Sequence, residues 1–331
     1  MDKTTSEKII EYIAKNSQAS GKELADYLEI TDRGVRKQLK TLLERNEICK
    51  IGKSPKVFYR IAAEKTVVFK LAMDGVVVGE KVKKFINDHY LNITPIGERK
   101  EGWAGFVAWC QKTNQDVARM AQDYYNLMEK YNKFKTEKGL IDGRKKIKNT
   151  FPEMHLDELF YVDFYSIERF GKTKLGQLLL HAKQSQNKKL IREISSEVKE
   201  KVEYLVKKFR IDGVGYIPPT VKREVQFMKE LQRNLKLPLR MLAISKIKTE
   251  IAVAQKTLTK LPDRIENAKK TFIVEGVTNY NNILLIDDAV GSGATLNEVA
   301  GKIREKKICK GKIIGLAITG SFKGFDVISE V

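Results

Sequence analysis

One run of the chain, from Ile283 to Leu296, constrains the fold more than any other. Four bulky apolar residues, Ile283 to Ile286, lead directly into two adjacent carboxylates, Asp287 and Asp288, and then into a loop of small residues. A short apolar run bounded by turn residues predicts a buried strand. The periodic segment Leu296–Glu305 predicts a helix after the loop. Strand, acidic pair, loop and helix in succession indicate one unit of an α/β sheet.

The same alternation extends over the C-terminal half of the chain. Predicted strands lie at 159–165, 213–217, 241–244, 283–286 and 312–318, and predicted helices at 174–183, 188–209, 221–235 and 296–305. Strands separated by helices imply a parallel sheet covered on both faces. Ligands of such sheets bind beyond the carboxyl ends of the strands, which is where Asp287 and Asp288 are expected.

The residues around the acidic pair restrict the kind of ligand. No lysine lies in the loop, which excludes a P-loop, and Leu296 stands where a dinucleotide fingerprint requires its third glycine. A small-residue loop at the start of a helix exposes backbone N–H groups to a phosphate. Two neighbouring carboxylates suit a vicinal diol, because each can accept from one hydroxyl. The pattern therefore indicates a ribose 5-phosphate.

The segment ILLIDDAVGSGAT resembles the signature of type I phosphoribosyltransferases, which bind phosphoribosyl pyrophosphate (PRPP). The resemblance implies that Asp287 and Asp288 contact the ribose hydroxyls. It also implies a loop that holds the 5-phosphate, made of Gly291, Ser292, Gly293, Ala294 and Thr295. Ala289 replaces the usual branched aliphatic residue, and Gly291 replaces the usual threonine, which removes one hydroxyl donor.

Within that superfamily, residues 160–320 are most similar to the ComF family. The family's series before the PRPP strand is matched by Gln255, Leu258, Arg264, Asn267 and Phe272, and its early helix by a segment that contains Lys183. The likeness implies that Lys222 and Arg223 lie on the pyrophosphate side, with Mg²⁺ bound together with PRPP. ComF relatives begin with a cysteine zinc module, which this chain lacks.

The N-terminal residues 1–63 predict a winged helix-turn-helix. Three short amphipathic helices are followed by two β-type segments joined by a basic turn, and the whole resembles bacterial or archaeal winged-helix regulators. Basic side chains on the third helix and the hairpin are expected to contact DNA. These candidate residues are Arg33, Arg36, Lys37, Lys40, Lys53 and Lys56. The alternative is a solvated face on a module that binds only protein.

Residues 64–155 predict a mostly helical linker or interface region. One helix is expected from about residue 103 to residue 134, with aromatic residues that form a core or a dimer contact. The run Arg144–Lys148 is read as a linker or solvated face, with a phosphate contact as the alternative. Residues 156–331 complete the division as a phosphoribosyltransferase-like domain, which makes the fold a multidomain α/β protein.

The composition of the chain indicates which classes of partner to expect. The 331 residues carry a formal net charge of +20, which favours polyanions such as nucleic acid or phosphorylated ligands; the alternative is a generally basic proteome. The three cysteines are widely spaced, which argues against a disulfide scaffold and for a reducing cytoplasm. No apolar run has the ~18 residues of a membrane span, so no membrane partner is expected. A homodimer is expected if the winged helix reads paired half-sites.

Three functions remain in competition. The first is a transcription regulator whose DNA affinity responds to PRPP or a nucleotide, by analogy with the purine-operon repressors. The second is an active phosphoribosyltransferase, which would transfer ribose 5-phosphate from PRPP to a base or an amine. The third is a ComF-like factor that handles incoming single-stranded DNA. The sequence favours the first and leaves open whether PRPP is consumed or sensed.

Overall fold

The chain divides into two compact units, residues 1–76 and residues 77–331, which are described separately. The computed structural model describes residues 4–16, 18–53, 56–62, 78–219, 223–247, 258, 260–276 and 279–322, with Lys53 and Lys56 described in their backbone only. Within these ranges, no helix combines the length and the apolarity that a membrane crossing requires.

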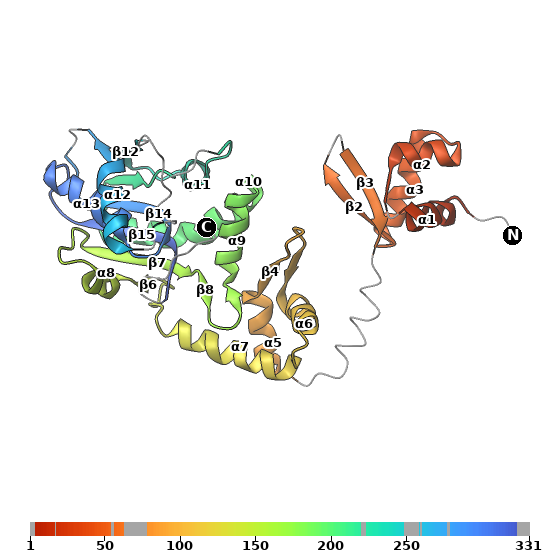
Figure 1. The fold of residues 1–331 in the computed structure, drawn as a ribbon, viewed down its shortest axis with the longest axis horizontal. Coiled ribbons are helices and arrows are strands. Elements are labelled where there is room, and N and C mark those ends of the chain that lie inside the picture. Colours follow the sequence, from red (N-terminus) through yellow and green to blue (C-terminus); the bar gives the residue numbers. More distant parts are fainter. Residues whose placement is uncertain are drawn as a thin grey trace. The chain divides into compact units, whose positions relative to one another are not determined.

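The N-terminal unit is a small helical domain with a β-hairpin (Figure 1). Its elements are α1 Thr5–Asn16, β1 Ala19–Ser20, α2 Gly21–Leu28, α3 Asp32–Glu44, β2 Ile48–Lys53 and β3 Lys56–Ile61. Strand β3 pairs with both β1 and β2, all antiparallel. Side chains from each helix, among them Ile9, Leu24 and Leu39, form one buried core.

Local capping fixes where the two helices of the turn begin. The Glu23 N–H donates to Ser20 Oγ at 3.2 Å, while the Glu23 carboxylate accepts from the Ser20 N–H at 2.6 Å. This reciprocal pair is a capping box and satisfies two donors at the start of α2. Thr31 Oγ1 accepts from the Gly34 N–H at 3.3 Å and caps α3. The N-terminal arrangement agrees with the predicted winged helix-turn-helix.

The second unit begins with helices and one short hairpin, β4–β5, and continues as an α/β sheet (Figure 1). Its first elements are α5 Glu80–His89, β4 Leu91–Ile93, β5 Arg99–Glu101, α6 Gly102–Lys112, α7 Val117–Asn132, β6 Ile141–Asp142, α8 Arg144–Thr150, β7 Glu158–Phe164, β8 Ser166–Ile167 and β9 Gly171–Lys172. The remaining elements are α9 Lys174–Gln184, α10 Lys188–Lys208, β10 Gly213–Tyr216, α11 Phe227–Leu235, β11 Arg240–Met241, β12 Ala243–Lys246, α12 Leu261–Thr271, β13 Phe272–Glu275, β14 Ile283–Val290, α13 Ala294–Glu305 and β15 Ile313–Gly320.

Two helix boundaries differ from the sequence-based prediction. The single helix expected over 103–134 is two helices, because Asn114 has a positive φ of 51° and Asp116 caps α7 through the Arg119 N–H at 2.7 Å. The helix expected from residue 221 begins at Phe227. The preceding backbone is bonded elsewhere, since the Val225 N–H donates to Gln186 Oε1 at 2.8 Å.

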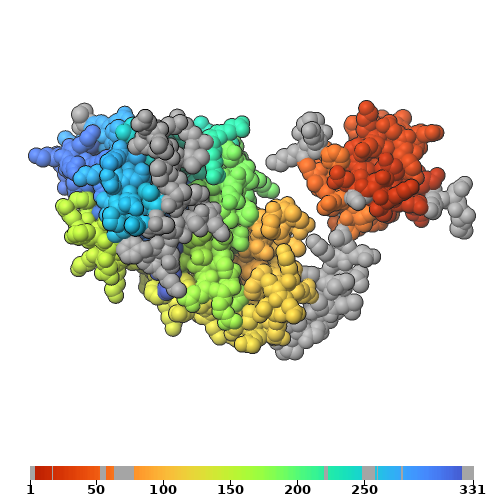
Figure 2. All heavy atoms as spheres, in the orientation of Figure 1, coloured from red at the N-terminus to blue at the C-terminus, as the bar shows by residue number. Residues whose placement is uncertain are grey.

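The helical segment 78–150 packs onto the α/β part rather than standing apart (Figure 2). Its aromatic core joins Phe106 and Tyr124 to Phe170, whose ring lies edge-on to Tyr124 at 5.1 Å. The Arg99 guanidinium forms a bidentate pair with Glu193 of α10, with both N–H···O distances at 2.8 Å. These aromatic residues therefore form a core, as the sequence favoured.

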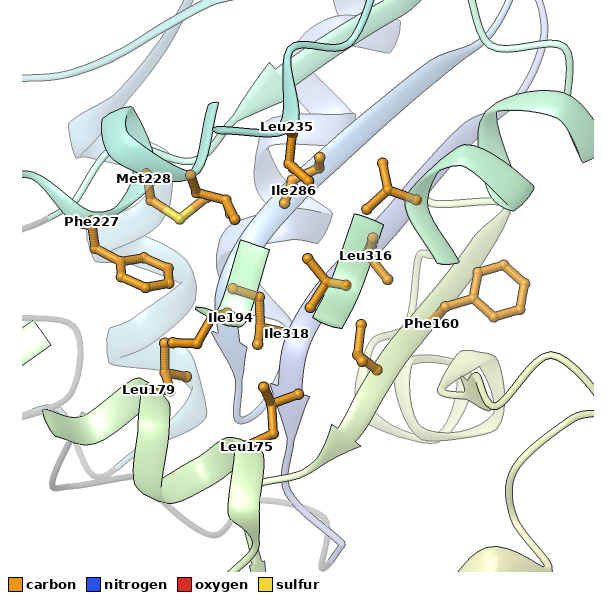
Figure 3. Packing of buried hydrophobic residues seen from close by; sticks show 14 of the residues in the cluster. Phe160, Leu175, Leu179, Ile194, Phe227, Met228, Leu235, Ile286, Leu316 and Ile318 are labelled. Atoms are coloured by element: carbon orange, nitrogen blue, oxygen red, sulfur yellow. The ribbon is translucent and has the colours of Figure 1, made fainter. Parts of the chain in front are cut away.

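The main sheet has six strands in the spatial order β11-β10-β14-β15-β7-β6. Five of them run parallel, and the short β6 pairs antiparallel with β7 at the edge. One face packs against α9, α10 and α11 through a large apolar cluster that includes Leu179, Ile194 and Ile286 (Figure 3). Covered parallel strands explain the nearly continuous apolar run of β14.

Strand β14 lies at the centre of this sheet, where the order of the strands reverses. From β10 the chain passes through α11 to β11 on one side and returns through α12 to β14 on the other. A crevice opens at the carboxyl ends of two strands whose connections leave in opposite directions. The end of β14, which carries Asp287 and Asp288, is thus at the position where α/β sheets bind ligands.

Candidate functional site

The acidic pair lies inside the last part of β14, whereas the sequence placed it after the strand. The strand continues to Val290 because β15 pairs with it as far as Gly320, with Asp287 opposite Ala317. Both carboxylates are half-buried. Successive strand side chains point to opposite faces of a sheet, so the two acids reach different neighbours.

Asp288 meets a lysine from the first helix of the α/β part. The Lys183 ammonium of α9 lies 2.7 Å from Asp288 Oδ2, and the two side chains are only 17% and 16% exposed. An ion pair shielded from water to this degree is screened less than a surface pair. Lys183 therefore fixes the direction of the Asp288 carboxylate.

Asp287 is in a less favourable setting. Burial raises its pKa first, and the Asp288 carboxylate next to it raises the pKa further. The Asp288 N–H, which donates to Asp287 Oδ1 at 2.8 Å, opposes this rise, as do the positive charges of Lys183 and Lys246. A ligand that donates hydroxyl hydrogen bonds or brings a cation would relieve the crowding of the two negative charges.

The loop after β14 forms a tight turn into α13. Gly293 has a φ of +87° and precedes the first helical residue, Ala294. Ser292 is buried, and its Oγ accepts from the Ala294 N–H at 3.3 Å. Gly291 and Thr295 are half-buried on either side. The loop therefore brings backbone N–H groups together at the positive end of a twelve-residue helix.

The residues expected on the pyrophosphate side are only partly described. Lys222 lies outside the described residues, whereas Arg223 is half-buried. The Arg223 guanidinium donates to the backbone carbonyl of Lys183. Arg223 and Asp288 are therefore connected through Lys183, which contacts the first by its backbone and the second by its side chain.

One residue of the series that resembles the ComF family, Phe272, contacts a further lysine. Gln255 lies outside the described residues, but Arg264 is buried and its Nε donates to the Leu258 carbonyl at 2.6 Å. Phe272 is buried on β13 and supports Lys246 of β12, whose Nζ lies 4.7 Å from the ring centroid. Burial lowers the pKa of Lys246, and the charge of Asp287 acts in the opposite direction.

Three lysines around the strand end were not among the ligand contacts that the sequence predicted. Lys183 and Lys246 approach Asp288 and Asp287, and Lys146 of α8 donates to Ser321, which follows β15. The basic run 144–148 contains Lys146, but the sequence does not tell which residue of that run faces the sheet. Helical spacing alone likewise does not tell which lysine of α9 faces β14.

The DNA-contact candidates on α3 share one exposed face. Arg33, Arg36, Lys37 and Lys40 are all exposed, while Val35 and Leu39 between them are buried. Lys40 also forms an exposed ion pair with Glu44 at 3.8 Å. The side chains of Lys53 and Lys56 at the hairpin tip lie outside the described part of the chain. Helix α3 thus offers a basic face of the kind that enters a DNA groove.

No dedicated metal cage occurs in the described ranges, where no three His, Cys, Asp or Glu side chains gather closely enough to hold an ion. Mg²⁺ commonly uses one or two carboxylates together with substrate phosphates and water. The two carboxylates at the end of β14 fit that requirement and do not suit a metal bound by protein groups alone.

Comparison with known proteins supports the N-terminal assignment. Residues 5–60 match a family model described as an HTH domain. No curated protein matches. Among solved structures, a hypoxanthine phosphoribosyltransferase from Staphylococcus aureus is 14% identical, with a TM-score of 0.24, over 42% of this chain and 80% of that protein. The chain thus carries an N-terminal helix-turn-helix domain of a DNA-binding type, followed by a mixed, mainly parallel α/β sheet.

Proposed function

We propose that this protein is a transcription regulator that binds DNA through its N-terminal domain and binds PRPP or another ribose 5-phosphate ligand at the end of β14. One observation supports the ligand proposal above all: two adjacent carboxylates lie in the last part of the central strand, at the point where the strand order reverses. The turn at Gly293 and the start of α13 follow them directly. Few ligands other than a phosphorylated sugar would use both features.

Each part of the ligand has a matching part of the site. Asp287 and Asp288 accept from the two ribose hydroxyls, which is the pairing that carboxylates and a vicinal diol favour. The backbone N–H groups of the loop 291–295 and the dipole of α13 hold the 5-phosphate. Arg223 and Lys246 supply positive charge for a pyrophosphate.

Mg²⁺ would bind with PRPP, and when bound it would neutralise the pyrophosphate oxygens. Asp287 and Asp288 are the protein groups that would share it. The raised pKa of Asp287 makes this carboxyl sensitive to such a charge, because a cation nearby favours its ionised form.

The DNA proposal rests on the match to an HTH domain and on the exposed basic face of α3. Arg and Lys at the start of such a helix reach base edges and phosphates in the major groove. The two activities together suit a ligand-responsive regulator, in which ligand and DNA each favour one conformation of the chain.

The experiment measures binding of duplex DNA with and without the ligand. A duplex is first selected from random sequence with the full chain, and its Kd is then measured by fluorescence anisotropy without ligand and with PRPP and Mg²⁺. The expected shift is about 5- to 150-fold, the usual range of allosteric coupling. Asp288→Asn should bind the duplex like the unchanged protein but lose the shift. An unaltered Kd at saturating PRPP would contradict regulation by PRPP.

An active phosphoribosyltransferase is the second candidate, and one observation favours it. Arg223, Lys183 and Lys246 place three cationic side chains around the strand end, which is more charge than sensing a 5-phosphate requires. In the reaction, a base or amine nitrogen would bond to C1 of the ribose as the bond from C1 to pyrophosphate breaks. Release of pyrophosphate from PRPP over a panel of bases tests this candidate, and no turnover with any of them excludes it for that panel.

The third candidate is handling of single-stranded DNA, and a competition binding assay distinguishes it from the regulator. A regulator should release a labelled duplex to unlabelled duplex much more readily than to a single strand of the same length. The reverse order of competition would favour the DNA-handling function.

A further inference from the structure

The basic run 144–148 lies in the short helix α8, beside β7 (Figure 1), and Ile147 of this helix contacts the candidate phosphate loop at Gly293. The side chain of Ile147 is buried, and it closes one side of the loop. A β-carbon placed on Gly293 would lie 3.1 Å from Ile147 Cδ1 and 3.8 Å from Phe151 Cε2. The loop thus takes its shape partly from a segment outside the predicted α/β domain.

The neighbouring residue Lys146 contacts Ser321, which is hydrogen-bonded to the strand residue before the loop. Its Nζ donates to the Ser321 carbonyl and to Ser321 Oγ, each at 3.2 Å. The Ser321 N–H in turn donates to the Val290 carbonyl at 3.1 Å, and Val290 is the residue directly before Gly291. Helix α8 therefore meets the loop directly through Ile147 at Gly293, and Lys146 is linked to the start of the loop through Ser321.

Burial distinguishes Lys146 from the other lysines of α8. Lys145 and Lys148 are exposed, whereas Lys146 is half-buried and directed by Ser321. A positive charge removed from bulk water interacts more strongly with an anion, because the solvent screens it less. The loop also lacks one side-chain donor to a phosphate, because residue 291 is glycine.

We propose that Lys146 supplies the cationic contact for the phosphate group held by the loop 291–295. The inference rests on the proposed ligand and extends the site to residues 144–150, which would make α8 part of the ligand-binding machinery. An ammonium group beside a phosphate dianion adds a charge-assisted hydrogen bond to the contacts from backbone N–H groups. Lys146 would thereby replace the donor that Gly291 lacks.

The test is calorimetric titration of ribose 5-phosphate into the full-length protein and three variants. Lys146→Met should weaken binding about tenfold or more, the effect of removing one hydrogen bond between charged groups. Lys148→Met, on the exposed side of the same helix, should bind within about twofold of the unchanged protein. Lys146→Arg should keep most of the affinity. Tryptophan fluorescence of each variant checks that the fold is intact.

The outcomes separate the inference from the function on which it rests. If the unchanged protein binds ribose 5-phosphate and folded Lys146→Met binds it equally well, the role of Lys146 is wrong and the proposed ligand stands. If the unchanged protein binds neither ribose 5-phosphate nor PRPP, the proposed ligand itself is wrong and the inference falls with it. Should Lys146→Met not fold, equal affinity of Lys146→Arg and Lys146→Gln would overturn the role of the charge.

Discussion

Replacing Gly293 by alanine tests whether the loop after β14 has both the strained shape and the function assigned to it. Gly293 has a φ of +87°, in the region that L side chains rarely adopt. An added β-carbon would also lie 3.1 Å from Ile147 Cδ1 and 3.3 Å from Ile147 Cγ1. The substitution therefore introduces backbone strain and a close contact at the same time.

The two effects have separate magnitudes. The left-handed backbone costs an L side chain about 1–2 kcal/mol, and displacing Ile147 in a packed site adds about 1 kcal/mol. A loss of about 2–3 kcal/mol corresponds to a decrease in Tm of roughly 4–12 °C for a unit of this size. Gly171 provides a matched control, because its φ is +76° but nothing lies within 4 Å of the added β-carbon. Gly171→Ala should lose only about 1–2 kcal/mol.

The assay is denaturant unfolding followed by tryptophan fluorescence. The chain has two tryptophans, Trp103 and Trp109, and both belong to the second unit, so the signal is not mixed with unfolding of the N-terminal domain. Binding of ribose 5-phosphate is measured on the same samples. Stability of Gly293→Ala equal to that of the unchanged protein would refute the strained turn. Reduced stability with unaltered binding would refute the loop as the phosphate site.

Three further outcomes are expected. Because the pKa of Asp287 is raised from its ordinary value of 3.8 in the folded state, the free energy of unfolding should fall as pH rises above that value. Asp287→Asn should therefore gain stability relative to the unchanged protein with rising pH, while losing ribose 5-phosphate binding, and a pH-independent difference in urea unfolding would contradict this. Arg36→Ala should weaken duplex binding and reduce the slope of log affinity against log salt concentration by about one. Lys15→Ala on α1 should change neither quantity. Fluorescence anisotropy at several salt concentrations measures both. Thr173→Val should destabilise the second unit by about 1–3 kcal/mol in thermal unfolding. The Thr173 hydroxyl donates to the Phe164 carbonyl at 2.6 Å and accepts from the Gly176 N–H at 3.0 Å, which caps α9. An unchanged Tm would show that these two hydrogen bonds do not stabilise the unit.

Most of the secondary structure that could be predicted from the sequence follows from patterns of neighbouring residues. The apolar run of β14, the capping box of α2 and the small-residue loop before α13 are signals within a few neighbouring residues, and each predicts an element that the structure contains. The end of β14 was placed too early, because the pairing of Val290 with Gly320 of β15 depends on residues thirty positions away.

Contacts between segments far apart in the chain could not be predicted from the sequence. Lys183 and Asp288 are 105 residues apart, and Lys146 and Ser321 are 175 residues apart. Each pair depends on the packing of a helix on the sheet, which periodicity does not specify. The break between α6 and α7 was missed for a local reason, since Asn114 adopts a positive φ that apolar spacing does not reveal.

Calorimetric titration of PRPP with Mg²⁺ into the full-length protein tests the central claim most directly. We expect one binding site per chain, with binding lost in Asp288→Asn while the tryptophan fluorescence of the variant stays native. Because Asp288 lies near the end of the central strand beside Lys183, loss of binding in this variant with the fold intact would assign the ribose to that strand end. No binding by the unchanged protein, or equal binding by Asp288→Asn, would contradict the account.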